Sequence, residues 1–278
     1  MNSPVSISRA FLRLVVFVAL CQLPFNRVNG QVTEIGGFFG GAYYIGDINP
    51  EKHFAMTRIS LGGVVRHSFD RHFALRLNAL VATLEGSDAI IEYNVNRNLS
   101  FVTSILEFSA QFEVSFLPFL FGDLYTPISP YLFGGAGAFA YNPRAFNYQG
   151  ELVTLRNLGT EGQWLGDPGL APYSLFSNNF VFGVGFKFNI SKDITGGLEY
   201  GIRFTGTDFI DDVSGYYPDN LRLTADARFF SDRSLDNRFG NTGFLRGDPT
   251  TKDKFSFFGF LLTVKLRISR DFLCPAYF

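Results

Sequence analysis

Residues 105–116 read ILEFSAQFEVSF, and every second side chain in this stretch belongs to the same chemical class. The even-numbered positions are apolar: Leu106, Phe108, Ala110, Phe112, Val114 and Phe116. The odd-numbered positions from 107 are polar: Glu107, Ser109, Gln111, Glu113 and Ser115. A period of two predicts a β-strand with two chemically opposite faces. A soluble protein would bury the phenylalanines, whereas a membrane barrel would turn them to lipid and the carboxylates to its lumen. Alternation alone fits both.

Strand-like segments recur along the 278 residues of the chain. Eight are predicted, over residues 33–46, 57–69, 72–84, 99–117, 130–141, 179–190, 194–206 and 255–269. All eight ranges exceed the roughly five or six residues of an ordinary soluble strand. They suffice for a tilted membrane strand, which needs about 9–11 residues to cross the hydrocarbon layer. The strand lengths therefore favour the membrane alternative.

The connections between these segments support the same choice. Short or medium turns are expected at 70–71, 118–129 and 191–193, and longer loops at 47–56, 85–98, 142–178 and 207–254. The long loops all fall at one end, as in outer-membrane barrels. Closing the sheet also removes edges whose unpaired amides would be costly in lipid. The sequence thus predicts an all-β fold: an eight-stranded antiparallel transmembrane β-barrel with long extracellular loops and short periplasmic turns.

In this fold, one face of each strand contacts lipid and the other faces the lumen. The apolar faces are expected to contact lipid through Leu106, Phe108, Phe112, Phe116, Phe182, Phe186, Phe260, Leu262 and Val264. The polar faces are expected to form a lumen network of Arg58, Arg66, Arg76, Glu107, Gln111, Glu113, Lys187, Glu199, Arg203, Lys265 and Arg267. An eight-stranded barrel is just wide enough for side chains to fill it, so charge pairs are expected to block the lumen. Interfacial aromatic belts are expected to include Tyr43, Tyr44, Tyr131, Tyr141 and Tyr200.

The N-terminus has the pattern of a secretory signal peptide. Arg9 and Arg13 precede the apolar stretch LVVFVALCQL, and VNG before Gln31 is a possible cleavage site. Two domains follow from this: a signal peptide over residues 1–30 and an outer-membrane barrel over 31–278. Cleavage would leave Cys274 as the one cysteine, so no intramolecular disulfide is expected. A lipoprotein anchored at Cys21 is the less favoured alternative.

Composition and motifs exclude several classes of function. The formal net charge of −1 provides no basic excess for nucleic acid. His67 and His72 lack metal-ligand spacing, and no nucleophile and base form a catalytic pattern. The stretch DFIDDVSG, residues 208–215, contains Asp208, Asp211 and Asp212, but lacks the spacing of an EF-hand loop. Hydrated or capping loop carboxylates are the favoured interpretation there. No enzyme activity, cofactor or metal is expected.

Several phrases in order resemble one known family. They include EIGGFFGGAYYIGDINP (34–50), RNLSFVTSILEFSAQFEVSF (97–116), PYLFGGAGAFAYNPRA (130–145), LEYGIRFTGTDFIDDVSGYY (198–217) and the terminal CPAYF. Together they resemble the PorG-like outer-membrane β-barrel family of Bacteroidota, over essentially the whole chain after residue 33. The final strand carries Gly259, Leu262 and Val264 in the spacing of a barrel recognition signal, with Phe257 in place of the expected polar residue.

The resemblance implies a location and a task. Known members are accessory components of the type IX secretion system, associated with its periplasmic ring subunits. The implied function is a non-enzymatic barrel that anchors secretion or gliding machinery in outer-membrane lipid. The alternative is a small ligand-binding or transport barrel whose long outer loops capture a hydrophobic or peptide ligand. The family supplies no catalytic residues.

Overall fold

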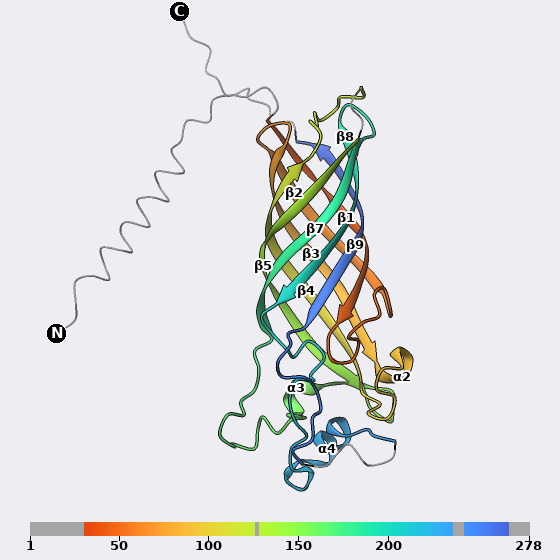
Figure 1. Ribbon diagram of the computed structural model, residues 1–278, viewed down its shortest axis with the longest axis vertical. Coiled ribbons are helices and arrows are strands. Elements are labelled where there is room, and N and C mark those ends of the chain that lie inside the picture. The colour runs from red at the N-terminus through yellow and green to blue at the C-terminus, as the bar shows by residue number, and fades with distance from the viewer. Residues whose placement is uncertain (1–30, 126–127, 236–241, 267–278) are drawn as a thin grey trace, which may run out of the picture.

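A computed structural model describes residues 31–125, 128–235 and 242–266 of the chain. Eight long strands form a cylinder, which stands upright in Figure 1. Their bounds are β1 Val32–Ile45, β2 Arg58–Ser68, β3 Phe73–Ser87, β4 Ser100–Ser115, β5 Ile128–Phe146, β7 Phe176–Asn189, β8 Ile194–Thr205 and β9 Lys254–Lys265. Each range overlaps one of the eight predicted segments, with differences of a few residues at the ends.

The sheet closes on itself. Each strand pairs antiparallel with its neighbour in the order β4, β3, β2, β1, β9, β8, β7, β5, and β4 also pairs with β5. The first and last strands meet over a long register, from Glu34 opposite Lys265 to Ile45 opposite Lys254. A short strand, β6 (Leu152–Thr154), pairs only with the end of β5 and stands outside the cylinder. The predicted eight-stranded antiparallel barrel is confirmed.

The two ends of the barrel differ. One end, called here the turn end, carries the β2–β3, β4–β5 and β7–β8 connections, the start of β1 and the end of β9. The loop end carries the four longer connections. Their short helices gather there (Figure 1): α2 Asp88–Ile91, α3 Leu155–Leu158, the 3₁₀ turn η1 Asn220–Arg222 and α4 Ala225–Ser231. Among the described residues, no helix is long and apolar enough to span a membrane.

The outer wall of the barrel is apolar. The nine residues expected to contact lipid all point outward, with exposed fractions between 42% and 61%: Leu106, Phe108, Phe112, Phe116, Phe182, Phe186, Phe260, Leu262 and Val264. Their strand neighbours Glu107, Gln111 and Glu113 are at most 1% exposed. The phenylalanine face of ILEFSAQFEVSF therefore looks out and its carboxylate face looks in.

Glycines on the inner wall make room for large inward side chains. At Gly183 of β7, an added Cβ would lie 2.2 Å from Cζ of Phe133 and 2.5 Å from the backbone oxygen of Tyr200. Atoms cannot approach that closely, and the backbone oxygen cannot turn away as a side chain can. Phe133 therefore occupies the space that a side chain at 183 would need.

Gly183→Ala is expected to cost about 1–3 kcal/mol of the free energy of unfolding, because it overpacks the inner wall. Gly63→Ala is the matched control, since the nearest atom to its added Cβ is 4.0 Å away. Urea titration of the two variants in detergent micelles measures the difference. Equal stability of both variants would contradict the packing described for Phe133.

Candidate functional site

The half of the lumen nearer the turn end holds a dense cluster of ion pairs centred on Glu113. Arg66 Nε lies 3.0 Å and Arg76 Nη1 3.2 Å from Glu113 Oε1, and Lys187 Nζ lies 3.5 Å from Oε2. Arg66 also reaches Glu34 Oε2 at 3.2 Å. The three cations come from β2, β3 and β7, so one carboxylate on β4 links strands on opposite sides of the barrel.

Arg76 extends the cluster toward β8. Its guanidinium pairs with Glu199, which also accepts a hydrogen bond from the Tyr131 hydroxyl. Arg76 donates to Gln111 Oε1 from Nε at 2.9 Å and from Nη2 at 2.6 Å. The same guanidinium lies over the Phe133 ring, 4.4 Å from its centroid. A guanidinium with this many partners is held in one orientation.

A second ion pair lies nearer the loop end. Arg203 Nε is 3.2 Å from Glu107 Oε2, which also accepts from Asn179 Nδ2 at 2.9 Å. Ser109 donates to the other oxygen of Glu107 at 3.1 Å. Arg203 lies over the ring of Phe257 at 4.5 Å, where the charged layer meets an aromatic one.

The lumen cluster balances in charge. In the described part of the barrel it combines four cations with four carboxylates: Arg66, Arg76, Lys187 and Arg203 with Glu34, Glu107, Glu113 and Glu199. Each of these side chains is at most 7% exposed. Charges removed from water need partners of opposite sign, and each of these side chains has one, although Arg66 Nη2 and Glu113 Oε2 make no hydrogen bond.

Three residues predicted for the lumen lie elsewhere. Arg58 stands at the loop end of β2, with its side chain 57% exposed and paired with Glu85. Lys265 is exposed at the turn end of β9. Arg267 lies outside the described residues. Both placed residues have the parity of the inner face, but each sits at a strand end, where a long cation reaches water and avoids desolvation.

The sequence prediction also missed Glu34. This carboxylate, 1% exposed, accepts from Thr263 Oγ1 at 2.6 Å and pairs with Arg66. Glu34, Gly36, Phe38 and Gly40 share one parity of β1, so the alternation of the first strand carried the signal. Small residues on both faces of that strand obscured it.

Between the charges and the loop end, the lumen is filled by apolar side chains. The inward residues toward the loop end form one buried cluster that includes Phe38, Leu80, Phe101, Phe139, Phe255 and Phe257. Where the apolar and charged layers meet, the cavity between Phe38, Arg76, Phe133 and Arg203 measures about 10 Å³. That is no more than one water molecule requires. The two layers together close the lumen.

No large steady conductance is expected in planar-bilayer recordings, because both layers would have to rearrange to open a path. An open eight-stranded barrel of the same strand length, refolded under identical conditions, calibrates the recording. Stable channel steps from the purified protein would mean that the charged layer is mobile.

The loop end is closed by a folded cap built from the longer connections. Arg97 binds both oxygens of Asp88, at 2.8 and 2.7 Å, and donates to the backbone oxygens of Arg246 and Asp47. Arg246 reaches Glu161 Oε1 at 3.0 Å. Buried arginines thus tie the β1–β2, β3–β4, β5–β7 and β8–β9 loops together.

The aspartates of the DFIDDVSG stretch are part of this cap. Asp208, Asp211 and Asp212 are at most 2% exposed, so the expectation of hydrated carboxylates is wrong. The expectation of capping holds in part: Asp211 Oδ1 accepts from Val213 N at 2.9 Å. Asp212 accepts from Thr160 Oγ1 and, at 2.5 Å, from Tyr173 Oη. Distant loop segments supply these partners, which is why the local pattern did not reveal the burial.

Burial perturbs the acidity of the cap. It raises the pKa of Asp212 to about 6 although Arg246 opposes the shift, and it raises the pKa of Asp208 to about 6. The pKa of Asp47 rises to about 7, mainly by burial and further through the charges of Asp208 and Asp248. Within the described residues, no group of three or more His, Cys, Asp or Glu side chains could hold a metal ion.

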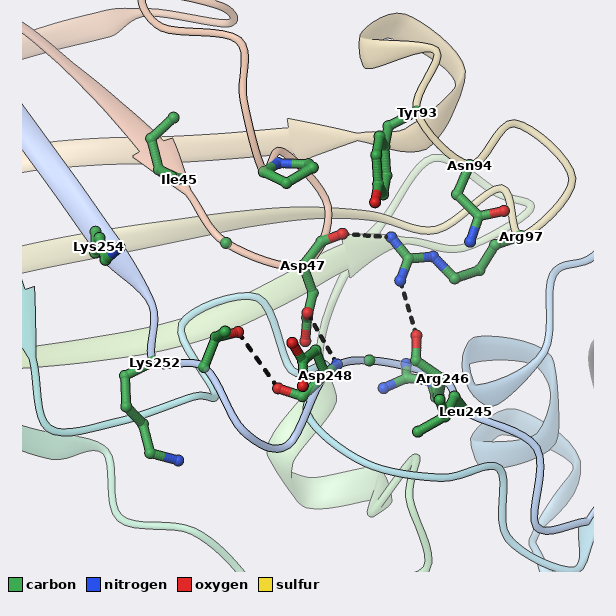
Figure 2. A pocket seen from close by; sticks show the side chains of 14 residues that line it. Ile45, Asp47, Tyr93, Asn94, Arg97, Leu245, Arg246, Asp248, Lys252 and Lys254 are labelled. Carbon is green, nitrogen blue, oxygen red and sulfur yellow. Dashed lines mark hydrogen bonds between the residues drawn. The ribbon is translucent and has the colours of Figure 1, made fainter.

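A cavity of about 340 Å³ lies where three cap loops meet. Figure 2 shows its lining: Asp47 from the β1–β2 loop, Tyr93 and Arg97 from the β3–β4 loop, and Asp248 and Lys252 from the β8–β9 loop. Asp248 N donates to Asp47 Oδ1 at 3.0 Å across its floor. The lining combines these charged side chains with the apolar Ile45, Pro50 and Leu245, so the cavity suits a small ligand that has both polar and apolar parts.

The tyrosines expected in aromatic belts lie mostly elsewhere. Tyr44, Tyr131 and Tyr141 point into the barrel or the cap and are at most 3% exposed. Inward side chains on these strands have no lipid interface to reach, so the belt assignment is wrong for them.

Tyr43 does point outward, but the β1–β2 loop covers it. His53 Nδ1 lies 2.9 Å from the Tyr43 hydroxyl, and the Phe54 ring centroid is 5.0 Å from that of Tyr43. The Tyr43 hydroxyl is also 2.7 Å from that of Tyr200. This loop therefore folds back over the outer wall of β1, β8 and β9.

The model of one protein family, described as a domain of unknown function (DUF6089), matches residues 12–156, just over half of the chain. The protein belongs to the DUF6089 family. The matched range includes β1 to β5, and thus the ILEFSAQFEVSF strand that carries Glu113 in this family member. No curated protein matches the sequence.

Solved structures of eight-stranded outer-membrane barrels are similar to this DUF6089 chain in fold. Ail, the attachment invasion locus protein of Yersinia pestis, in complex with a heparin analogue, has a TM-score of 0.40 at 7% identity, covering 85% of this chain and 99% of its own. Neisserial surface protein A has 0.43 at 9%, covering 84% and 97%. OprG from Pseudomonas aeruginosa has 0.38 at 8%, covering 85% and 94%. At this level of similarity, the role of none of them carries over to this chain.

Proposed function

We propose that the protein is a non-enzymatic, non-conducting barrel of the outer membrane that serves as an anchoring component of the type IX secretion machinery. The observation that carries the proposal is the double closure of the barrel, by charge pairs inside and by a folded cap at the loop end. A barrel closed in this way cannot pass a solute. Its function would therefore be to bind partners through its outer surfaces. The PorG-like phrases of the sequence, a family pattern of Bacteroidota, supply the type of machinery.

The proposal includes an export route and an orientation. Residues 1–30 act as a cleaved leader, and residues 31–278 insert with the turn end in the periplasm. The apolar outer wall supports lipid as the surroundings of the barrel, and the short turns suit the periplasmic side. The periplasmic ring subunits of the secretion system are then the proposed partners, and they would contact the turn end.

Two tyrosines at opposite ends of the barrel allow a directional test. Tyr125, in the β4–β5 connection at the turn end, is 97% exposed, and Tyr148, in the β5–β7 loop, is 83% exposed. The tagged protein is expected to recover ring subunits from solubilised membranes. Tyr125→Asp is expected to weaken that recovery, whereas Tyr148→Asp leaves it unchanged. Recovery of the barrel without any stable partner would contradict the proposal.

A second candidate function is capture of a small ligand by the cap. The 340 Å³ cavity between Asp47, Arg97 and Lys252 favours it, although the closed lumen opposes transport. Mass spectrometry of small molecules released from the purified protein on denaturation would test this candidate. A ligand retained by the wild type and lost from Lys252→Glu would place the function in the cap instead of at the turn end.

A further inference from the structure

Three oxygen atoms meet where the cap joins the barrel. The Tyr44 hydroxyl lies 2.6 Å from Asp211 Oδ2 and 2.6 Å from Asp253 Oδ1. Tyr44, Asp211 and Asp253 are each at most 1% exposed. The second oxygens of the two carboxyl groups are also engaged, because Val213 N donates to Asp211 Oδ1 at 2.9 Å and Ile210 N donates to Asp253 Oδ2 at 2.8 Å.

These contacts require one more hydrogen than two ionised aspartates supply. A phenol donates a single hydrogen bond, and an ionised carboxylate only accepts. With both aspartates ionised, one of the two 2.6 Å contacts would join oxygens with no hydrogen between them, in a buried place. With one aspartate protonated, that acid donates to Tyr44 Oη while Tyr44 donates to the other aspartate, and both contacts become hydrogen bonds.

We propose that Asp211 and Asp253 share one extra proton through Tyr44, and that this proton latches the cap onto the barrel. The three residues come from parts of the chain that the latch must hold together. Tyr44 is near the loop end of β1, Asp211 lies within the β8–β9 loop, and Asp253 directly precedes β9. The latch therefore pins the long β8–β9 connection to the rim of the barrel.

The surroundings favour holding the proton. The titratable and charged groups that face the latch are Asp47 of the β1–β2 loop, Arg97 of the β3–β4 loop, Tyr141 of β5 and Asp208 of the β8–β9 loop. Arg97, the one cation in this set, already binds both oxygens of Asp88. Burial raises the pKa of Asp211 and of Asp253 well above the usual range, and the neighbouring carboxylates raise both further.

The direction of the pH effect follows from these shifts. An aspartate whose pKa is raised in the closed cap binds a proton there that it would release in an open cap at the same pH. The closed cap is therefore most stable at acidic pH. It loses stability as the pH rises from about 4, the ordinary value for aspartate, through the raised value in the cap. For each proton held in this way, the equilibrium constant for closing the cap falls about tenfold per pH unit across that window.

Hydrogen exchange of the full-length protein in detergent micelles tests the latch. The probes are the amides of residues 207–216, which include Ile210 and Val213, with protection factors corrected for the intrinsic pH dependence of exchange. Asp253→Asn and Asp211→Asn each replace an acid with an amide that donates to Tyr44 without titrating. From pH 5 to pH 9, wild-type protection is expected to fall at least about tenfold further than that of either variant.

The control variant is Asp226→Asn, in the same loop but exposed in the first turn of α4. It is expected to follow the wild-type pH dependence. Heat-modifiable gel migration confirms separately that each variant has a folded barrel, so a lost cap is not mistaken for a lost fold. Because each aspartate is replaced in a separate variant, the test can still be made if one of the two variants does not fold.

Two results would overturn the proposal. One is the same pH dependence in the wild type and in both asparagine variants, which would show that no titrating proton is held at Tyr44. The other is recovery of wild-type protection at pH 9 on addition of Ca²⁺, which would identify the carboxylates as a cation site. Neither result depends on whether ring subunits bind the turn end.

Discussion

Glu113→Gln is expected to remove about 3–5 kcal/mol from the free energy of unfolding, the usual loss when one partner of a buried ion pair is deleted. Glu113 contacts Arg66, Arg76 and Lys187 within 3.5 Å, and its side chain is fully buried. The amide keeps the shape but loses the charge. The lumen cluster would then hold four cations and three carboxylates, and Arg66, Arg76 and Lys187 would each lose a charged partner. Since total stabilities are commonly about 5–15 kcal/mol, the loss is a large fraction.

The measurement is urea-induced unfolding in lipid bilayers, with the folded fraction read from the shift in gel migration. Glu85→Gln provides the matched control, because Glu85 pairs with Arg58 at the exposed loop end of the barrel. An exposed pair contributes about 0–1 kcal/mol. Similar small losses in both variants would mean that water enters the lumen and solvates the cluster.

Phe112→Arg is expected to lower the free energy of unfolding by about 1–4 kcal/mol in a bilayer, since it places a cation within the apolar wall, three residues from the turn end of β4. Phe112 is 44% exposed and lies within the outward apolar stretch of β4 that runs from Leu106 to Phe116. Phe146→Arg is the matched control. Phe146 also points outward, at 49% exposure, but it ends β5 at the loop end. There the expected cost is about 0–1 kcal/mol.

Chemical labelling separates this orientation from its reverse. A cysteine at position 112 is expected to react with a lipid-soluble maleimide in membranes and to resist a charged one. A cysteine at 146 is expected to react with both. Ready reaction of the folded 112 variant with the charged reagent would mean that the wall at this position faces water.

The barrel itself could be predicted from the sequence because strand alternation is a local property. Every lipid-facing residue in the prediction is exposed, since a period of two fixes the face of a side chain once one neighbour is assigned. Gln111 and Phe112 illustrate this: adjacent in sequence, they are 1% and 44% exposed. The outward assignment then required only that the strands were too long and too apolar for a soluble sheet.

The limits of the lumen network could not be predicted in the same way. Parity places Arg58 and Lys265 on the inner face, but the depth of a residue along the barrel depends on register and tilt, which come from pairing with other strands. Glu34 shows the opposite case. Its face was readable in principle, but its partner Arg66 is 32 positions away and becomes visible only when β1 and β2 are aligned.

The cap was beyond sequence reasoning for a related reason. Its buried polar groups find partners in other loops, as Asp212 does with Thr160 and Tyr173. An aspartate-rich loop with no periodicity is ordinarily a hydrated one, and nothing local marks the exception. The inward direction of Tyr44 was hidden as well, because the aromatic pair Tyr43–Tyr44 reads equally well with either member outside.

The position of the latch also dictates an order of maturation. Tyr44 belongs to the first strand and Asp253 directly precedes the last, 209 positions later, so they become neighbours only when β1 and β9 pair. Contacts between such distant residues form late, after the intervening chain has been ordered. A chain that has inserted seven strands but not joined its ends can have no latch, and its longest loop stays untied. The latched cap can therefore form only after the first and last strands have closed the barrel.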